Sequence, residues 1–183
     1  MIGIRVHGRG GQGAVTFAHI LSVAATYEGK YGQSCQGLTI ERRGAPSMGF
    51  ARIGDKPIAE RGAISRPDYV VVIDPFVVKG ADVEAGLAEN GLVVINSPVD
   101  PGMKHKCIYL DATGIALDII KRPITNTVML GAFSAASGLV SIDNIEKGAR
   151  FILGKKASDD VVESNVKAIR RAYDTVIENQ NKQ

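Results

Sequence analysis

The segment His7–Thr16, HGRGGQGAVT, decides the fold of this chain. It follows the short apolar run IGIRV (2–6), which we predict to be a strand, and it leads into AVTFAHILSVAATYEGK (14–30), whose mostly apolar pattern predicts a helix. Gly8, Gly10 and Gly13 fit the pattern G-x-G-x-x-G, and Gly11 adds a fourth glycine. The sequence therefore predicts a strand, a tight glycine loop and a helix in direct succession.

The glycine loop is suited to holding an anion. Glycine allows a tight turn and a close approach, and the first amides of the following helix point their N–H groups and the positive end of the helix dipole at a ligand. Phosphate, pyrophosphate and carboxylate all satisfy this arrangement. The side chain of Gln12 can reach such a ligand or pin the loop to its own backbone. The alternative is that the glycines only permit a close strand-to-helix crossing, with nothing bound.

Further apolar runs alternate with helical patterns after this unit. RPDYVVVIDPF (66–76) contains a strand expected to be buried on both faces, and LVVIN (92–96) and KCIYL (106–110) predict further strands. Helices are expected at 80–91 and 111–121, while 30–46 is expected to cross the surface and 50–58 to form a hairpin turning at Gly54–Lys56. Only helices are predicted after residue 124, and they cover 126–139, 142–153 and 158–179.

This order of elements predicts an α/β fold. We expect a three-layer, Rossmann-like domain with a mainly parallel sheet, made mixed by the hairpin, and helices on both faces. The chain has 183 residues, of which 45% are hydrophobic and 22% charged, and no linker or repeat interrupts it. A single domain over residues 1–183 follows.

A nicotinamide or flavin dinucleotide would require one more feature. The pattern needs an acidic residue about 20 positions beyond the glycines to hold the ribose hydroxyls. Tyr31, Gly32 and Gln33 occupy that region, whereas Glu28 is early and Glu41 is late. A free-standing Rossmann-like oxidoreductase that uses NAD or FAD is therefore the alternative function rather than the first one.

Composition excludes several other classes of protein. A net charge of +3 gives no support for nucleic-acid binding, and no apolar run is long enough to cross a bilayer, so we expect a cytoplasmic protein. Cys35 and Cys107 are the only cysteines, too few to ligate an iron–sulfur cluster within the chain. No histidine has metal-ligand spacing, so no metal site is predicted.

Four other residues each allow two interpretations. Arg42 and Arg43, in a glycine-flanked segment, either bind phosphate or a partner carboxylate, or are solvated or ion-paired between subunits. Asp74 follows a buried strand, where open sheets place ligands, but it is equally suited to capping the next turn. His7 is expected to fix the loop by a hydrogen bond rather than to act as an acid or base.

Four segments together resemble the gamma subunit of the 2-oxoacid:ferredoxin oxidoreductases, and most of all the pyruvate (pyruvate synthase) type. They are HGRGGQGAVT (7–16), ERRGAPSMGFARI (41–53), RPDYVVVIDP (66–75) and TNTVMLGA (125–132). The resemblance runs over nearly the whole chain in the same order. It implies a complex that cleaves a 2-oxoacid on thiamine diphosphate, passes electrons through iron–sulfur clusters to ferredoxin, and transfers the acyl group to coenzyme A.

The resemblance also implies a division of labour. Thiamine diphosphate, magnesium and the clusters belong to the alpha, beta and delta partner subunits, and the isolated gamma chain is expected to be inactive. Its own role is structural and includes positioning coenzyme A, with no catalytic residue. The residues carried over for coenzyme A are those of the loop, with Thr16 as a hydroxyl donor and the arginine pair: Gly8, Arg9, Gly10, Gly11, Gln12, Gly13, Thr16, Arg42 and Arg43. Fused relatives have a different loop sequence, so individual contacts need not transfer to Arg9 or Gln12.

Overall fold

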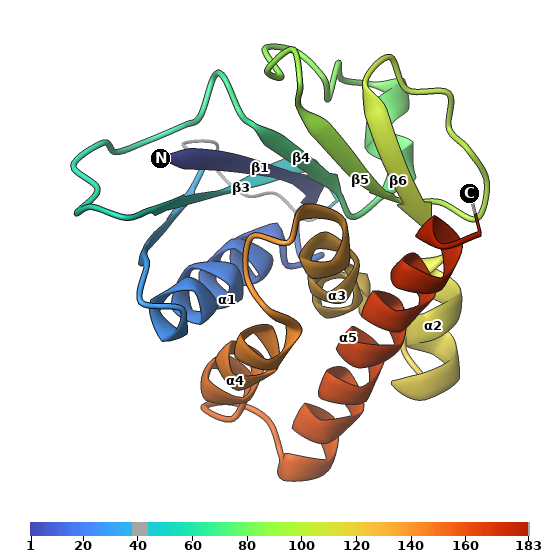
Figure 1. The fold of residues 1–183 in the computed structure, drawn as a ribbon. Coiled ribbons are helices and arrows are strands. Elements are labelled where there is room, and N and C mark those ends of the chain that lie inside the picture. The colour runs from blue at the N-terminus through green and yellow to red at the C-terminus, as the bar shows by residue number, and fades with distance from the viewer. Residues whose placement is uncertain (38–43, 183) are drawn as a thin grey trace.

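The described part of the chain folds into a six-stranded mixed sheet with five α-helices packed on one side (Figure 1). The computed structural model describes residues 1–37 and 44–182. The elements are β1 (Ile2–Arg9), α1 (Ala14–Tyr27), β2 (Tyr31–Gln36), β3 (Pro46–Gly54), β4 (Tyr69–Val72), the 3-10 helix η1 (Pro75–Lys79), β5 (Leu92–Asn96), β6 (Lys106–Leu110), α2 (Ala112–Ile119), α3 (Thr125–Ser137), α4 (Ile142–Leu153) and α5 (Asp159–Gln180).

The strand order is β2-β3-β1-β4-β5-β6, with β1 near the centre. Strands β1, β4, β5 and β6 run parallel to one another, whereas β3 is antiparallel to both of its neighbours, β1 and β2. The predicted mixed, mainly parallel α/β sheet is confirmed. Parallel strands need helical or looped crossovers, which explains why buried runs such as LVVIN alternate with covering segments in the sequence.

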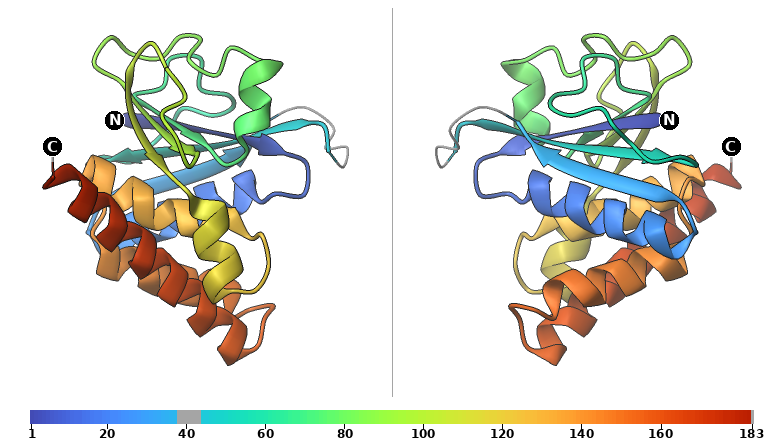
Figure 2. Two further views of the ribbon diagram at one scale, coloured as in Figure 1. Left: turned by 90° about the vertical axis from the view of Figure 1, so that its right-hand side faces the viewer. Right: turned by 90° about the vertical axis from the view of Figure 1, so that its left-hand side faces the viewer.

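Alternate residues of each central strand face two different cores. Val71 and Ile73 belong to the larger core with side chains of α1 to α5, whereas Val70 and Val72 belong to a smaller core with Val77. Figure 2 shows the α-helices below the sheet, and η1 with long loops above it. We expected helices on both faces, but in the described chain the second face is covered by one 3-10 turn and loops instead of an α-helix.

The prediction of a hairpin over 50–58 is wrong, because the strand expected after the turn does not form. Strand β3 does supply the antiparallel strand, but it pairs with β2, which precedes it, with Cys35 opposite Phe50. Residues 55–61 have no regular secondary structure. The segment 31–36, expected to cross the surface, is an edge strand, and its half-buried, polar sequence YGQSCQ lacks the alternation that marks a strand.

The helix expected over 80–91 is also absent. This segment is a series of turns, with Leu87 N donating to Glu84 O and Gly86 at a φ of 72°. Val83 and Leu87 are both buried in the smaller core. Their spacing of four residues imitates a helix face, but the turn at Gly86 breaks the helix.

The helices that complete the larger core are the last in the chain. Helix α3, with the small, apolar sequence TNTVMLGAFSAAS, is buried over most of its length. At Gly131 the backbones of α3 and α5 lie so close that an added Cβ would sit 1.9 Å from Ile169 O. Across the described residues, no helix combines the length and apolar character required to span a membrane.

Candidate functional site

The glycine loop lies at the carboxyl edge of the sheet, where the strand order changes direction. From β1 the chain continues through α1 to β2 on one side, and from β4 it continues to β5 on the other. Ligands of open α/β sheets bind outside the carboxyl ends of the strands at such a point. Arg9 ends β1, and Asp74 follows β4 at the same edge.

Where the loop leaves β1, its backbone is hydrogen-bonded to the segment that leads into β3. Gly10 N donates to Ala45 O at 2.7 Å, and Gly44 N donates to Gly10 O at 3.2 Å. The chain then turns through Gly11, at a φ of 92°, and reaches Gly13, at a φ of 80°. Both angles lie in the left-handed region that favours glycine. Gly11 is exposed, and an added Cβ there would meet nothing within 4 Å.

Asp74 fixes the loop through a set of hydrogen bonds that we call the Asp74 clasp. Its Oδ2 accepts from Arg9 Nε and from Gln12 Nε2, each at 2.6 Å, and Arg9 Nη2 lies 2.5 Å away. Its Oδ1 accepts from Phe76 N at 2.9 Å, which caps η1. Burial raises the pKa of Asp74, but these hydrogen bonds outweigh it and the pKa is lowered overall, so the carboxylate is ionised.

Gln12 pins the loop as well as joining the clasp. Its Oε1 accepts from Arg9 N at 2.6 Å, while its Nε2 is the group that donates to Asp74. Of the two roles that the sequence left open for Gln12, the structure shows the one that fixes the backbone. Arg9 is likewise engaged within the protein, although 44% of its side chain is exposed.

Helix α1 begins directly under the loop without a capping side chain. Gly13 is its N-cap residue, it supplies no side-chain cap, and the first turn carries no acidic residue. The first turn consists of Ala14, Val15 and Thr16. Ala14 is buried, and Val15 and Thr16 are half-buried. The amides of a helix start are unsatisfied within the helix, so this end of α1 favours negative charge.

Glycines also allow the helix to lie close to the sheet. An added Cβ at Gly49 of β3 would sit 2.4 Å from Ala14 O, and one at Gly32 of β2 would sit 2.0 Å from Ser22 O. At Gly13 it would meet Asn126 Nδ2, which donates to Gly13 O at 3.3 Å. The close crossing that the sequence allowed as an alternative is therefore present, together with a helix start that has no side-chain cap.

The sequence-predicted residues are thus brought together in part. Gly10 to Gly13 form the loop and Thr16 lies in the first turn of α1, whereas Gly8 and Arg9 are the last residues of β1, which extends beyond the predicted strand at 2–6. Arg42 and Arg43 lie outside the described residues. Sequence reasoning missed Phe76 and Asn126, and of these Phe76 carried a signal, since an aromatic residue directly after Asp-Pro at a strand end falls at the ligand-binding edge of the sheet.

His7 lies on the other side of β1 from the helices, away from the loop's polar contacts. Its Nε2 accepts a hydrogen bond from Arg5 Nε at 3.0 Å, and Arg5 also donates to Val83 O and Ala85 O. His7 therefore fixes Arg5 rather than the loop that we had expected. Burial, together with the nearby charge of Arg5, lowers the pKa of His7 to about 4.

This lowered pKa predicts acid sensitivity. Between pH 6.5 and about 4 the unfolded chain binds a proton at His7 and the folded chain does not, so stability falls as the pH falls through this window. From pH 7 to 4.5 we expect His7 to account for a loss of about 2 kcal/mol in the free energy of unfolding. Urea titrations of the wild-type subunit and of His7→Gln, which keeps an acceptor for Arg5, measure it. Parallel pH profiles for the two chains would refute the assignment.

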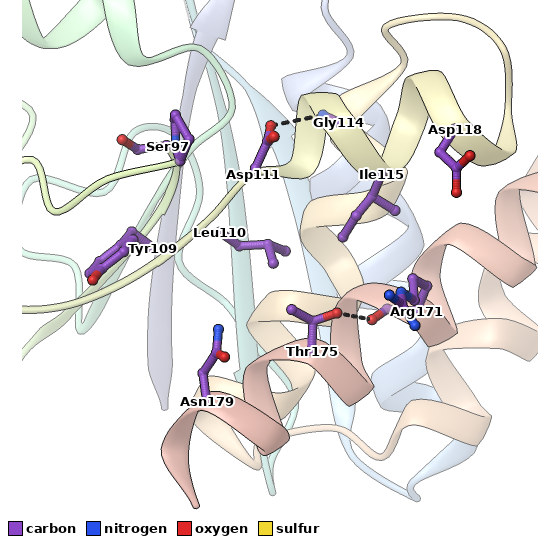
Figure 3. Close-up of a pocket in the computed structure, with 11 residues that line it drawn as sticks. Ser97, Tyr109, Leu110, Asp111, Gly114, Ile115, Asp118, Arg171, Thr175 and Asn179 are labelled. Atoms are coloured by element: carbon purple, nitrogen blue, oxygen red, sulfur yellow. Dashed lines mark hydrogen bonds between the residues drawn. The ribbon is translucent and has the colours of Figure 1, made fainter. Parts of the chain in front are cut away.

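A separate hollow of about 360 Å³ lies further along the same edge, between β5, β6, α2 and α5 (Figure 3). Two of its polar side chains are engaged locally, since Asp111 Oδ1 accepts from Gly114 N and Thr175 Oγ1 donates to Arg171 O. None of the residues predicted from the sequence lines it. The glycine loop therefore remains the candidate site.

Comparison with known proteins assigns the chain to a family. The model of the pyruvate ferredoxin/flavodoxin oxidoreductase family matches residues 3–175. Pyruvate synthase subunit PorC of Methanothermobacter thermautotrophicus is 49% identical over 96% of both chains. The common gamma subunit of the pyruvate/ketoisovalerate oxidoreductases of Pyrococcus furiosus is 46% identical over 95% of this chain and 96% of its own.

A solved structure agrees with these relatives. The pyruvate oxidoreductase subunit PORC of Thermotoga maritima superposes with a TM-score of 0.82 and 38% identity, over 94% of this chain and 95% of that one. Sequence and fold thus agree over almost the full length, and the resemblance noted in the four sequence segments is confirmed. The chain belongs to the pyruvate ferredoxin/flavodoxin oxidoreductase family, among the gamma subunits of these enzymes.

Proposed function

We propose that this gamma subunit positions coenzyme A in a 2-oxoacid:ferredoxin oxidoreductase, with pyruvate as the leading substrate. Its proposed partners are the alpha, beta and delta subunits, which hold thiamine diphosphate, magnesium and the iron–sulfur clusters, and, through the complex, ferredoxin. The proposed compartment is the cytoplasm. The subunit itself contributes binding and orientation rather than a reacting group.

One observation carries this proposal: helix α1 starts under a glycine loop with no capping side chain in the described chain and no acid in its first turn. The amides of Ala14, Val15 and Thr16 are the donors that a pyrophosphate group would use. Gly11 leaves the approach free of a side chain, since nothing lies within 4 Å of its added Cβ. The Asp74 clasp keeps the loop in this shape before a ligand arrives, which lowers the entropic cost of binding.

The remaining predicted residues have supporting roles. Arg9 is 44% exposed but paired with Asp74, so the backbone amides, rather than a free guanidinium, supply most of the attraction. Gly44 is bonded to Gly10, and in the sequence Arg42 and Arg43 directly precede it. We propose that this arginine pair adds charge beside the loop.

A dinucleotide cofactor is less well supported. In a dinucleotide-binding fold the ribose acid follows the strand after the first helix. Here that strand is β2, which ends at Gln36, and β3 lies between it and β1. The NAD or FAD alternative therefore lacks its acidic residue among the described positions.

A charge placed at the helix start tests the proposal. Thr16→Glu puts a carboxylate at the third helical position, where it stabilises a helix by its dipole but repels an anion. Thr16→Gln has the same size without the charge. In the assembled enzyme we expect the KM for coenzyme A to be at least about tenfold higher in Thr16→Glu than in Thr16→Gln, because an anionic ligand would meet like charge at close range. The KM for pyruvate serves as the reference.

Two other outcomes have defined meanings. Equal values of KM for coenzyme A in the two variants would mean that no anion binds at the helix start, and the subunit would then only brace its neighbours. Melting temperatures of the two subunits check that folding is intact, since the Glu variant is expected to be at least as stable as the Gln variant.

A further inference from the structure

Phe76 is an exposed aromatic residue beside the glycine loop. It is the second residue of η1, and 65% of it is accessible to solvent. Phe17, Phe50 and Phe133 are fully buried in the core, whereas Phe76 is exposed. A bare ring at the carboxyl edge of the sheet offers a flat surface at the place where open α/β sheets bind ligands.

Two cationic side chains flank this ring. The guanidinium carbon of Arg9 lies 6.0 Å from the ring centroid, and Lys79 Nζ lies 5.5 Å from it. Both distances are within the range of cation–π attraction. The ring and the two cations together suit a ligand that combines a planar heterocycle with phosphate groups.

The ring is held at a fixed position relative to the loop. Asp74 Oδ1 accepts from Phe76 N, while Oδ2 of the same carboxylate accepts from Arg9 and Gln12. A single buried side chain thus links the backbone that carries the ring to the backbone that precedes α1. A ligand spanning the two surfaces would meet a preformed pair of subsites.

We propose that Phe76, with Arg9 and Lys79, forms the subsite for the adenine nucleotide end of coenzyme A. The purine stacks on the ring of Phe76, and Lys79 faces a phosphate on the ribose, while the pyrophosphate occupies the start of α1. This inference rests on the proposed function and adds the part of the ligand that each group contacts. Every base presents a flat π-surface, and stacking on an aromatic side chain contributes substantially to nucleotide affinity.

The chain offers a matched control for this site. Phe151 on α4 is also exposed, by 50%, and Lys155 Nζ lies 4.1 Å from its ring centroid. Helix α4 belongs to the helical layer, on the opposite side of the sheet from η1 (Figure 2). Phe151 thus shares with Phe76 an exposed ring and a nearby lysine, but it does not share the position next to the glycine loop. A comparison of the two residues tests whether that position matters for binding.

The test uses the assembled enzyme with Phe76→Leu, Phe76→Trp and Phe151→Leu. We expect Phe76→Leu to raise the KM for coenzyme A about tenfold, with kcat and the KM for pyruvate unchanged, because it removes the stacking surface but keeps an apolar side chain. Phe76→Trp, which retains a ring, should restore the KM to within about threefold of wild type. Phe151→Leu should have no effect. Adenosine 3′,5′-bisphosphate, used as a competitive inhibitor, should lose affinity about tenfold in Phe76→Leu alone.

Each contrary result has a distinct reading. An unchanged KM in Phe76→Leu, together with a raised KM in Thr16→Glu, would overturn the base subsite and leave the loop proposal standing. Unchanged values in both variants would overturn both proposals. Loss of the complex on size-exclusion chromatography of Phe76→Leu would show that the ring is a subunit contact, which would also overturn the subsite.

Discussion

Replacing Gly131 with alanine is expected to lower the free energy of unfolding of this subunit by about 3 kcal/mol, at the upper end of the cost of overpacking a core. The added Cβ would lie 1.9 Å from Ile169 O and 2.8 Å from the carbonyl carbon of the same residue. Both atoms belong to the backbone of α5, so no side-chain rotation relieves the contact and the two helices must separate. Helix propensity alone predicts the opposite sign, a gain of up to about 1 kcal/mol for alanine over glycine.

Urea denaturation of the isolated subunit measures this effect. The control is Gly80→Ala, because an added Cβ at Gly80 meets nothing within 4 Å and its φ of −115° is accessible to alanine. That variant is expected to change stability by no more than about 0.5 kcal/mol. If the two variants prove equally stable, the close contact of α3 and α5 does not limit the packing of the core.

Removal of the clasp is the second large effect. Asp74→Ala deletes the acceptor for Arg9, Gln12 and the Phe76 amide at once. We expect a loss of about 2 kcal/mol in stability, less than for a fully buried ion pair because Arg9 is 44% exposed. The amides of Gly10 to Gly13 should also exchange with deuterium faster, since Gln12 loses its anchor.

Asp100→Ala is the matched control for the clasp. Asp100 is exposed and accepts from Gly102 N, at 2.9 Å, within its own turn. Its removal is expected to cost at most about 0.5 kcal/mol and to leave exchange in the loop unchanged. Equal exchange rates of the loop amides in Asp74→Ala and wild type would show that the glycines hold their conformation without the carboxylate.

The fold was predictable where apolar runs decide it. The runs around Val71, Val94 and Ile108 became parallel strands, and the patterns after residue 124 became helices. The partner of β3 was not predictable in this way, because YGQSCQ lies on a half-buried edge and its pairing depends on segments distant in sequence. Similarly, Val83 and Leu87 have helical spacing although turns hold them against the sheet.

The candidate site was predictable in its backbone and less so in its side chains. Glycine spacing after a strand indicates the loop at Gly10–Gly13 directly, because few other residues tolerate the left-handed angles of Gly11 and Gly13. The engagement of Arg9 by Asp74 joins residues 65 positions apart, and no local pattern indicates that pairing. Thus the sequence could not show that Arg9 is already partnered before any ligand binds.

The dependence of the sheet on α3 and α5 has a consequence for biosynthesis. Ile4, Val71 and Val94 are covered by a core that includes Val128, Leu130 and Ile169, which are translated last. A nascent chain that has emerged only as far as β6 therefore has an uncovered apolar sheet face, the kind of intermediate that aggregates or recruits chaperones. We therefore expect this face of the sheet to be covered only after α3 and α5 have been synthesised.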